Sequence, residues 1–256
     1  MCGRYASSRR PEDLIEEFEI ADDRTGGALE PDYNVAPTKE VYAVVARPPR
    51  PPADAPDAVE PAQRQLRVLR WGLVPSWAKD PSIGNRMINA RMESVAEKPA
   101  YKRAFAKRRC LLPADGYFEW YPTSQLTAAG KPRKQPFFIR PQDHGILAMA
   151  GLYEIWRDPT RAEDDPERFR WTCTVITTDA EDSLGHLHDR MPLMVERERW
   201  AEWLDPEPPS PEGLLDLLVP AAPGRLEAFP VSTLVSNVKN NGPELVEPLP
   251  LEEVLT

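Results

Sequence analysis

The chain has 256 residues, of which 41% are hydrophobic and 29% charged, and its formal net charge is −9. This length allows one large domain or two small ones, and the composition is typical of a soluble globular protein. No apolar run approaches the roughly 18 residues of a membrane span, and the N-terminus lacks the apolar core of a secretory signal. We therefore expect a cytoplasmic protein whose three cysteines stay reduced, with Cys110 and Cys173 in the core.

Basic residues are concentrated in one part of the chain. Between Arg64 and Arg109 there are twelve Lys or Arg residues and three acidic residues, which gives this segment a charge of +9 and the remainder −18. Such an asymmetry can produce one positive face on an acidic body, and phosphate binding responds to the local face. Scattered, solvated charges explain the count nearly as well, so charge alone does not decide between the two.

The predicted elements begin with a short helix over residues 11–20, where proline and acids occupy the first turn. A β-branched, aromatic run predicts a strand at 41–46, and strand-like residues resume at 66–74. The segment 47–63 is rich in Pro, Ala and Asp and is interpreted as an exposed loop inserted between two strands. Further helical pieces are predicted at about 93–107, 196–204 and 211–218, and strands at 109–114, 116–121, 136–140, 146–156, 170–178 and 226–231.

Many strands separated by turns and irregular loops, with few short helices, predict a mixed α+β fold. The alternation of strands and helices is too irregular for a doubly wound sheet, and the chain has no internal repeat. We expect one domain over residues 1–256. The 30 prolines indicate long ordered loops, which is where binding and catalytic sites tend to be built.

The first candidate for chemistry is Cys2. Removal of Met1 would leave a cysteine with a free α-amino group, whose amine and thiol have pKa values of roughly 8 and about 8.5. Both groups therefore react at neutral pH. With an aldehyde, the amine forms an imine and the thiol then closes onto the imine carbon to give a thiazolidine. Taken alone, the Met-Cys start is explained more simply by an ordinary second residue.

Two further segments carry polar groups that suit this chemistry. Asn89 and Arg91 occupy alternate positions, so in an extended segment they share a face. Glu119 lies in an aromatic strand-like run; facing inward, it would have a raised pKa suited to proton transfer. Alternation by itself instead predicts an outward face for Glu119, between Phe118 and Trp120.

A third segment contains His186, His188 and Arg190. His188 could shuttle protons and Arg190 could hold a phosphate, although a histidine that simply bonds a loop fits equally well. Zinc is the alternative for the two histidines. Because structural zinc sites take four N or S ligands and only His144 remains in a chain without a cysteine pair, we predict no metal site.

These candidates belong to seven segments that run along nearly the whole chain: MCGRY at the start, YNVAPT (33–38), RWGLVPSWAKD (70–80), INARMES (88–94), RCLLPADGYFEW (109–120), HDRMP (188–192) and SNVKNNGPEL (236–245). In this order they closely resemble the SOS-response-associated peptidase (SRAP) family, also called abasic-site processing proteins. The resemblance implies a single domain with a mainly antiparallel, barrel-like β core and short peripheral helices.

The resemblance also implies a function. Cys2, exposed by removal of Met1, would crosslink through a thiazolidine to the aldehyde of an abasic site in single-stranded DNA and shield the lesion during the DNA damage (SOS) response. Such a DNA–protein crosslinking enzyme would add a peptidase activity limited to Met1 and a lyase-type release. It would act as a monomer, associated with DNA in the cytoplasm, without a cofactor or metal.

The roles of individual residues follow from the same resemblance. Asn89 would hold the Cys2 amine and the sugar by hydrogen bonds. Glu119 would move protons during imine formation and ring closure and would favour reversal, and His188 would help to open the cyclic sugar. The expected DNA contacts are Arg4, Arg91 and Arg190 on phosphates, Trp71 stacked on a base, and Asn34 and Pro37 in a loop near the strand.

Three alternatives belong to other functional classes. An N-terminal-nucleophile amidohydrolase, such as a class II glutamine amidotransferase, also begins Met-Cys-Gly, and it needs an Asn-Gly oxyanion hole. Asn241-Gly242 is present, but it lies within the SNVKNNGPEL segment. A non-catalytic DNA-binding module would bind reversibly and without Cys2. A protease acting on other proteins would need a peptide groove, for which the sequence gives no indication.

Overall fold

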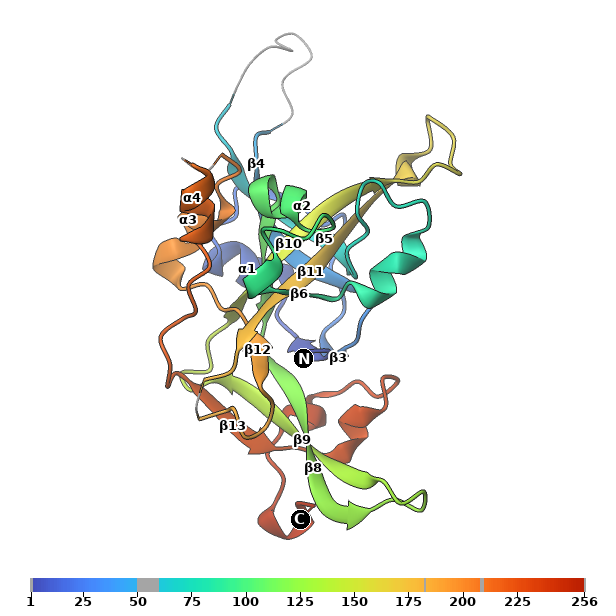
Figure 1. Ribbon diagram of the computed structural model, residues 1–256, viewed down its shortest axis with the longest axis vertical. Coiled ribbons are helices and arrows are strands. Elements are labelled where there is room, and N and C mark those ends of the chain that lie inside the picture. The colour runs from blue at the N-terminus through green and yellow to red at the C-terminus, as the bar shows by residue number, and fades with distance from the viewer. Residues whose placement is uncertain (1, 50–59, 182, 208–209, 256) are drawn as a thin grey trace.

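The computed structural model describes residues 2–49, 60–181, 183–207 and 210–255. Within these residues, five strands close into a barrel in the order β11–β10–β7–β4–β5, and β5 returns to pair with β11 (Figure 1). Four of the five junctions are antiparallel, and the β5–β11 junction is parallel, with Arg70 opposite Thr172 and Trp71 opposite Cys173. The barrel strands are β4 (Glu40–Arg47), β5 (Gln63–Trp71), β7 (Arg109–Ala114), β10 (Leu147–Arg157) and β11 (Phe169–Asp179).

Three short strands extend this sheet at its margins. β2 pairs with β5 and β12 with β11, while β6 lies parallel to β11 and places Asn89 opposite Val175. A strand of three residues is not stable by itself, so each of these strands depends on its pairing with a barrel strand. Their bounds are Asp22–Arg24 for β2, Asn89–Arg91 for β6 and Arg190–Pro192 for β12.

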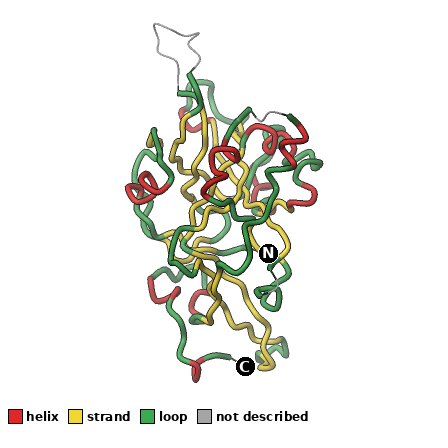
Figure 2. Tube along the Cα trace, turned by 90° about the vertical axis from the view of Figure 1, so that its left-hand side faces the viewer, coloured by secondary structure: helices red, strands yellow, loops and turns green. Residues whose placement is uncertain are grey.

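A second sheet of five strands lies beside the barrel, in the order β13–β9–β8–β1–β3. Its strand β1 pairs with both β3 and β8, which holds the start of the chain between the two sheets. Figures 1 and 2 both place the N-terminus below the barrel and above the long β8–β9 hairpin. The strands are β1 (Tyr5–Ser7), β3 (Asp32–Val35), β8 (Gly116–Leu126), β9 (Pro132–Pro141) and β13 (Leu226–Pro230).

Short helices cover the outside of the barrel, where they complete one of two large apolar cores. α1 begins with Pro11, whose fixed φ suits the first helical turn, and Asp13 bonds the backbone of Arg10. The helices are α1 (Pro11–Glu17), α2 (Lys102–Lys107), α3 (Trp200–Leu204) and α4 (Pro211–Leu215). Single 3₁₀ turns occupy Pro81–Arg86, Met92–Ser94, Pro166–Arg168, Arg197–Arg199, Thr233–Ser236, Pro243–Val246 and Leu251–Glu253.

The other large core fills the barrel interior and the space below it. It contains all three cysteines, and Cys110 and Cys173 are completely buried among apolar side chains, as expected. The α+β class and the barrel-like β core are confirmed. Residues 50–59 of the predicted 47–63 loop lie outside the described residues, while Arg47 and Gln63 at its ends face each other in the β4–β5 pair. No helix in the described part of the chain is long and apolar enough to cross a membrane.

Candidate active site

Cys2 lies three residues before the start of β1 and has no exposed surface. Its carbonyl oxygen accepts a 2.7 Å hydrogen bond from the side-chain amide nitrogen of Asn89, and its Sγ lies 3.9 Å from the carbonyl oxygen of Arg4. Asn89 is fixed in turn by the β6–β11 pairing and by the Tyr101 hydroxyl, which donates to its backbone oxygen at 3.1 Å. The sequence-predicted pair Cys2 and Asn89 is therefore in direct contact, although 87 residues separate them.

The side-chain amide oxygen of Asn89 is not used in its contact with Cys2. It is buried, and no donor among the described residues bonds it. The amide cannot rotate to satisfy its oxygen, because only the nitrogen end can donate to the Cys2 carbonyl. A buried acceptor without a donor costs roughly 1–3 kcal/mol, which a bound amine or hydroxyl would recover.

Glu119 lies on β8 opposite Phe137, and only 5% of its surface is exposed. Burial raises the pKa of its carboxyl to about 7. The outward orientation predicted from alternation is wrong. Glu119 does alternate with Phe118, but both faces of this part of β8 are covered, one by the core that contains Cys2 and the other by a smaller aromatic core. A carboxyl with a pKa near neutrality can both accept and return a proton.

The Cys2 thiol is strongly perturbed by the same environment. Burial raises its pKa far above the usual range, and the negative charge of Glu119 raises it further. The thiol is therefore protonated at neutral pH, and it must give up a proton when the sulfur attacks. The negative charge of Glu119 acts on this thiol, which makes Glu119 the candidate acceptor of that proton.

His188 is the third predicted catalytic residue and is partly buried. Its Nδ1 lies 2.9 Å from the backbone nitrogen of Arg190 and also 2.9 Å from an Asp189 oxygen. Burial lowers the pKa of His188, which favours the neutral ring. Because a neutral Nδ1 that accepts from the Arg190 N–H cannot also donate to Asp189, the ring proton is assigned to Nε2.

One lysine that the sequence did not single out belongs to this group. Lys134 on β9 is exposed, and its positive charge acts on both Glu119 and His188, adding to the lowering of the His188 pKa and opposing the rise at Glu119. A cation at this position would attract a backbone phosphate to the catalytic groups. The sequence gives no signal for it, because a lysine in a polar hairpin is most often solvated.

The predicted phosphate contacts differ in their availability. Arg91 is exposed on β6, two residues from Asn89. Arg190 forms ion pairs with Glu93 at 2.7 Å and Asp179 at 2.6 Å, and only 12% of its side chain is exposed. In this structure Arg190 therefore joins β12 to its neighbours, and a phosphate would have to displace a carboxylate to reach it.

Asn34 and Arg4 hold a loop together. The Arg4 guanidinium donates to the Asn34 oxygen at 2.6 Å and to the backbone oxygen of Val235 at 2.9 Å. The Asn34 amide nitrogen lies within 3.2 Å of the carbonyl oxygens of Val235, Asn237 and Asn240. Asn34 is completely buried, so the expected DNA contact is not available to it, while the neighbouring YNVAPT residue Pro37 is partly exposed.

Trp71 does not present a surface for a base. Its side chain is completely buried, its indole N–H donates to the Ile88 oxygen at 2.9 Å, and its ring packs against Tyr5 at 5.1 Å. The expectation that Trp71 stacks on DNA is corrected by this burial. Trp77, six residues later in the same RWGLVPSWAKD segment, is 61% exposed. Strand alternation places Trp71, at the end of β5, on the side that faces the barrel interior. This pattern could have distinguished the buried Trp71 from the exposed Trp77.

The Trp77 loop is held firmly although Trp77 itself is exposed. The indole N–H of Trp156 donates to the Ala78 oxygen at 2.7 Å. Gly72 has φ +130°, and a Cβ there would lie 2.6 Å from the Gly84 oxygen, so the two ends of the loop can approach only as glycines. An exposed aromatic ring on a fixed loop is the arrangement used to stack single-stranded bases.

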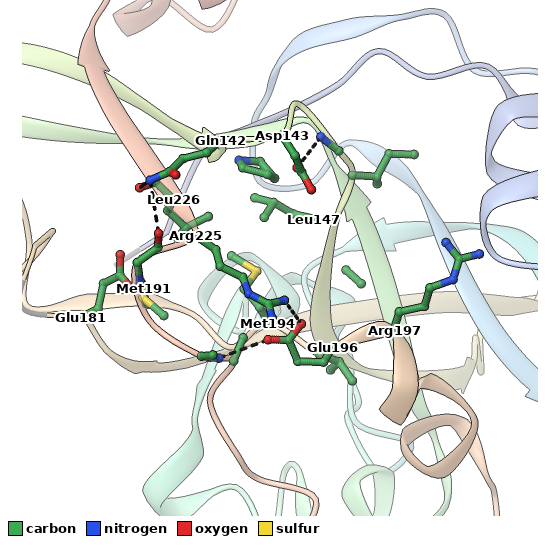
Figure 3. A pocket seen from close by; sticks show the side chains of 18 of the residues that line it. Gln142, Asp143, Leu147, Glu181, Met191, Met194, Glu196, Arg197, Arg225 and Leu226 are labelled. Atoms are coloured by element: carbon green, nitrogen blue, oxygen red, sulfur yellow. Dashed lines mark hydrogen bonds and ion pairs between the residues drawn. The ribbon is translucent and has the colours of Figure 1, made fainter.

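A cavity of about 560 Å³ lies away from these residues, on the side of β10 and β12 shown in Figure 3. Its apolar lining includes Leu147 and Met191, and its rim carries an ion pair between Arg225 and Glu196 at 2.6 Å. It contains none of the predicted catalytic residues. Among the described residues, no group of three or more His, Cys, Asp or Glu side chains could hold a metal.

The structure is a single domain with a closed barrel, and Cys2 and its neighbours form the candidate site. A family model described as "SOS response associated peptidase (SRAP)" matches residues 1–238, and the chain belongs to this family. Abasic site processing protein YoqW of Bacillus subtilis is 38% identical over 96% of this chain and 99% of its own length. Abasic site processing protein HMCES of Gallus gallus is 32% identical over 98% of this chain and 79% of its own length.

Solved structures show the same fold. A crystal structure of a protein from Bacteroides thetaiotaomicron superimposes with a TM-score of 0.75 over 97% of this chain and all of that one, at 24% identity. A protein from Bordetella bronchiseptica superimposes with a TM-score of 0.65 over 90% of this chain and all of that one, at 20% identity.

Proposed function

We propose that this protein captures abasic sites in single-stranded DNA by forming a thiazolidine between Cys2 and the deoxyribose aldehyde. The observation that carries the proposal is the 2.7 Å hydrogen bond from Asn89 to the Cys2 carbonyl, which fixes the second residue beside a carboxyl with a pKa of about 7. The relatives named abasic site processing proteins support the choice of lesion.

Removal of Met1 is the first step. While Met1 is attached, the Cys2 nitrogen is part of a peptide bond and cannot form an imine, and Cys2 has no exposed surface. Hydrolysis of the Met1–Cys2 bond releases methionine and leaves the aminothiol. We assign this peptidase activity to the protein's own N-terminus and to no other substrate.

The crosslink then forms in two stages. The Cys2 amine attacks C1′ of the open-chain sugar, and loss of water gives an imine. The sulfur next attacks C1′, the thiol proton leaves, and the imine nitrogen is protonated to give the ring. Overall, one water molecule is released and no cofactor is consumed.

The site residues supply the proton transfers that these stages require. Glu119, with a pKa of about 7, protonates the departing hydroxyl and then accepts the thiol proton. Neutral His188 carries its proton on Nε2 and helps to open the cyclic sugar. The open oxygen of Asn89 accepts a hydrogen bond from the amine or a sugar hydroxyl. The same groups catalyse the reverse of these steps, which opens the ring and releases the DNA in a lyase-type reaction.

We assign DNA binding to three exposed side chains. Arg91 and Lys134 hold backbone phosphates, and Trp77 stacks on a base beside the lesion. Arg190 joins them when a phosphate replaces one of its carboxylate partners. One chain acting as a monomer in the cytoplasm covers one lesion, and the persistent ring shields it during the DNA damage response.

A denaturing gel tests the proposal. Purified protein is mixed with a single-stranded oligonucleotide that carries one abasic site, and intact mass spectrometry establishes whether Met1 is gone. We expect a band that survives denaturation, requires the abasic site and disappears in Cys2→Ala. Cys110→Ala is the matched control, because Cys110 is an equally buried cysteine outside the site.

The other functional classes predict different results. Processed protein that gives no band but releases ammonia from glutamine would identify an amidotransferase. Reversible, salt-sensitive binding that survives Cys2→Ala would identify a simple DNA-binding module. Cys2-dependent fragments from unfolded protein substrates would show that the peptidase activity extends beyond Met1.

A further inference from the structure

One end of the barrel is closed by arginine and aromatic side chains. Trp171 on β11 stacks on Tyr153 of β10, with ring centroids 5.5 Å apart and ring planes at 11°. The guanidinium carbons of Arg47 and Arg67 lie 5.1 and 4.2 Å from the centroid of the Trp171 ring. Because interior positions alternate along barrel strands, this group forms the last layer of the barrel interior, which we call the arginine end.

The arginine end is remote from Cys2. Asn89, which bonds the Cys2 carbonyl, pairs with Val175 on β11, four residues beyond Trp171. At about 3.3 Å per residue, the two levels are roughly 13 Å apart along the strand. Figure 1 labels β4, which ends at Arg47, near the top of the barrel, and the N-terminus lies below the barrel.

The two arginines over Trp171 have no acidic partner. The Arg47 side chain makes no hydrogen bond or ion pair with the residues that the structure describes, apart from its contact with the ring. Arg67 donates from Nε to the neutral side chain of Gln65 at 2.9 Å. Both side chains are partly buried, so water screens their charges less than it would at an open surface.

Two acids on neighbouring strands are paired with other arginines. Asp22 pairs with Arg24 at 2.7 Å, and Glu154 pairs with Arg108 at 2.7 Å. Asp22 acts on the charge of Arg67, but its carboxylate already pairs with Arg24, so in the described part of the barrel neither arginine over Trp171 has a carboxylate of its own.

This imbalance affects Arg67 directly. Burial lowers its pKa, and repulsion from Arg47 and Arg24 lowers it further. Like charges held together in a partly buried site repel each other, and a bound anion removes that repulsion. Planar guanidinium groups match the oxygens of a phosphate, whereas a single carboxylate can satisfy only one of them fully.

We propose that Arg47 and Arg67 form a phosphate-binding site at the arginine end of the barrel, opposite Cys2. The Trp171 ring is already covered by Tyr153 and the arginines, so the site recognises the charge of the ligand and not a base. The phosphate can come from a free phosphate compound or from the backbone of nucleic acid that reaches this end. The proposal does not depend on covalent chemistry at Cys2.

Calorimetry with pyrophosphate at constant ionic strength tests the site itself. We expect the wild-type protein to bind pyrophosphate and the double variant Arg47→Gln/Arg67→Gln to bind it at least tenfold more weakly. Arg10→Gln/Arg225→Gln is the matched control, because it removes two exposed arginines that are each paired with an acid. Equal binding by all three proteins, or no binding by the wild type, would overturn the proposal.

A salt titration distinguishes the two sources of phosphate. In a Cys2→Ala background, affinity for an undamaged 30-nucleotide single strand is measured over a range of salt. Each phosphate contact contributes about 0.7 to the slope of log affinity against log salt for single strands. Loss of two contacts in Arg47→Gln/Arg67→Gln should reduce the magnitude of the slope by about 1.4, and this result identifies nucleic acid as the source of the phosphate. An unchanged slope, with pyrophosphate binding intact in the wild type, identifies a free phosphate compound.

A charge-conserving variant separates loss of phosphate binding from loss of folding. Arg47→Lys/Arg67→Lys keeps both positive charges but loses the planar fork of each guanidinium. We expect its affinity for pyrophosphate to lie between those of the wild type and the Gln variant, with an unchanged melting temperature. Lys-variant affinity equal to that of a folded Gln variant would refute charge recognition at this site.

Discussion

Substitution of Glu119 by glutamine is expected to stabilise the fold while it abolishes the chemistry. Glu119 is 5% exposed, and burial raises its pKa from 4.5 to about 7. A difference of that size corresponds to about 3 kcal/mol, since each pH unit is worth about 1.4 kcal/mol. The isosteric amide has no charge to bury, so it escapes this penalty.

The size of this stabilisation depends on pH. Because the folded state holds the Glu119 proton more tightly than the unfolded chain does, wild-type stability falls as the pH rises from 4.5 to 7 and changes no further above that range. Relative to wild type, Glu119→Gln should therefore gain about 1 kcal/mol at pH 5 and about 3 kcal/mol at pH 8. For a chain of this length, the gain at pH 8 corresponds to a rise in melting temperature of roughly 5–10 °C.

Urea unfolding at pH 5 and pH 8 measures the difference, with mass spectrometry to confirm that the compared proteins have the same N-terminus. Glu97→Gln, which removes a negative charge at an exposed position, is the control. Crosslinking by Glu119→Gln should fall by 10²-fold or more, since proton transfer by a positioned group contributes about that much. A stability difference that is the same at both pH values would refute the reasoning, because the burial of the charge would then carry no cost.

Three further predictions follow from the site. Asn89→Asp removes the donor to the Cys2 carbonyl, and single-turnover crosslinking should slow by about 10²-fold while binding of undamaged DNA stays within threefold; equal rates would exclude the positioning role. Trp77→Ala should weaken single-strand binding by about 1–3 kcal/mol in a fluorescence anisotropy titration, with Trp77→Phe as the control, and wild-type affinity in both would remove Trp77 from the interface. Asn34→Ala removes one of the two acceptors of the Arg4 guanidinium and the donor to the Asn237 and Asn240 carbonyls, so denaturant unfolding should show a loss of roughly 2–4 kcal/mol; a loss below 0.5 kcal/mol would contradict the anchoring role.

Most of the long strands could be predicted from the sequence, because apolar runs such as 146–156 and 170–178 fill a barrel interior and remain recognisable at that length. The short strands could not. β1, β2, β6 and β12 have three residues each, and pairing with longer neighbours stabilises them more than their own sequence does. β6 is the consequential case, since it carries Asn89 and only the β6–β11 pairing brings that side chain to Cys2.

The site shows where local patterns stop being informative. Alternation correctly separates Glu119 from Phe118, but it cannot tell which side of β8 is exposed, because tertiary packing covers both. The family resemblance selected Cys2, Asn89, Glu119 and His188, and the structure brings Cys2 into contact with Asn89 and under the electrostatic influence of Glu119. The resemblance did not reveal that the polar groups of Asn34 and Arg190 bind other residues of the protein.

The burial of Cys2 sets a time limit on its processing during protein synthesis. Strand β8, which pairs with β1 just after Cys2, leaves the ribosome more than a hundred residues later. At about 5–20 residues per second, a host aminopeptidase has on the order of 6–20 s of free access to the N-terminus before this cover can form. Under the self-processing proposed above, a chain that folds with Met1 still attached releases it at its own site, so slower translation should increase the share of molecules processed by other enzymes.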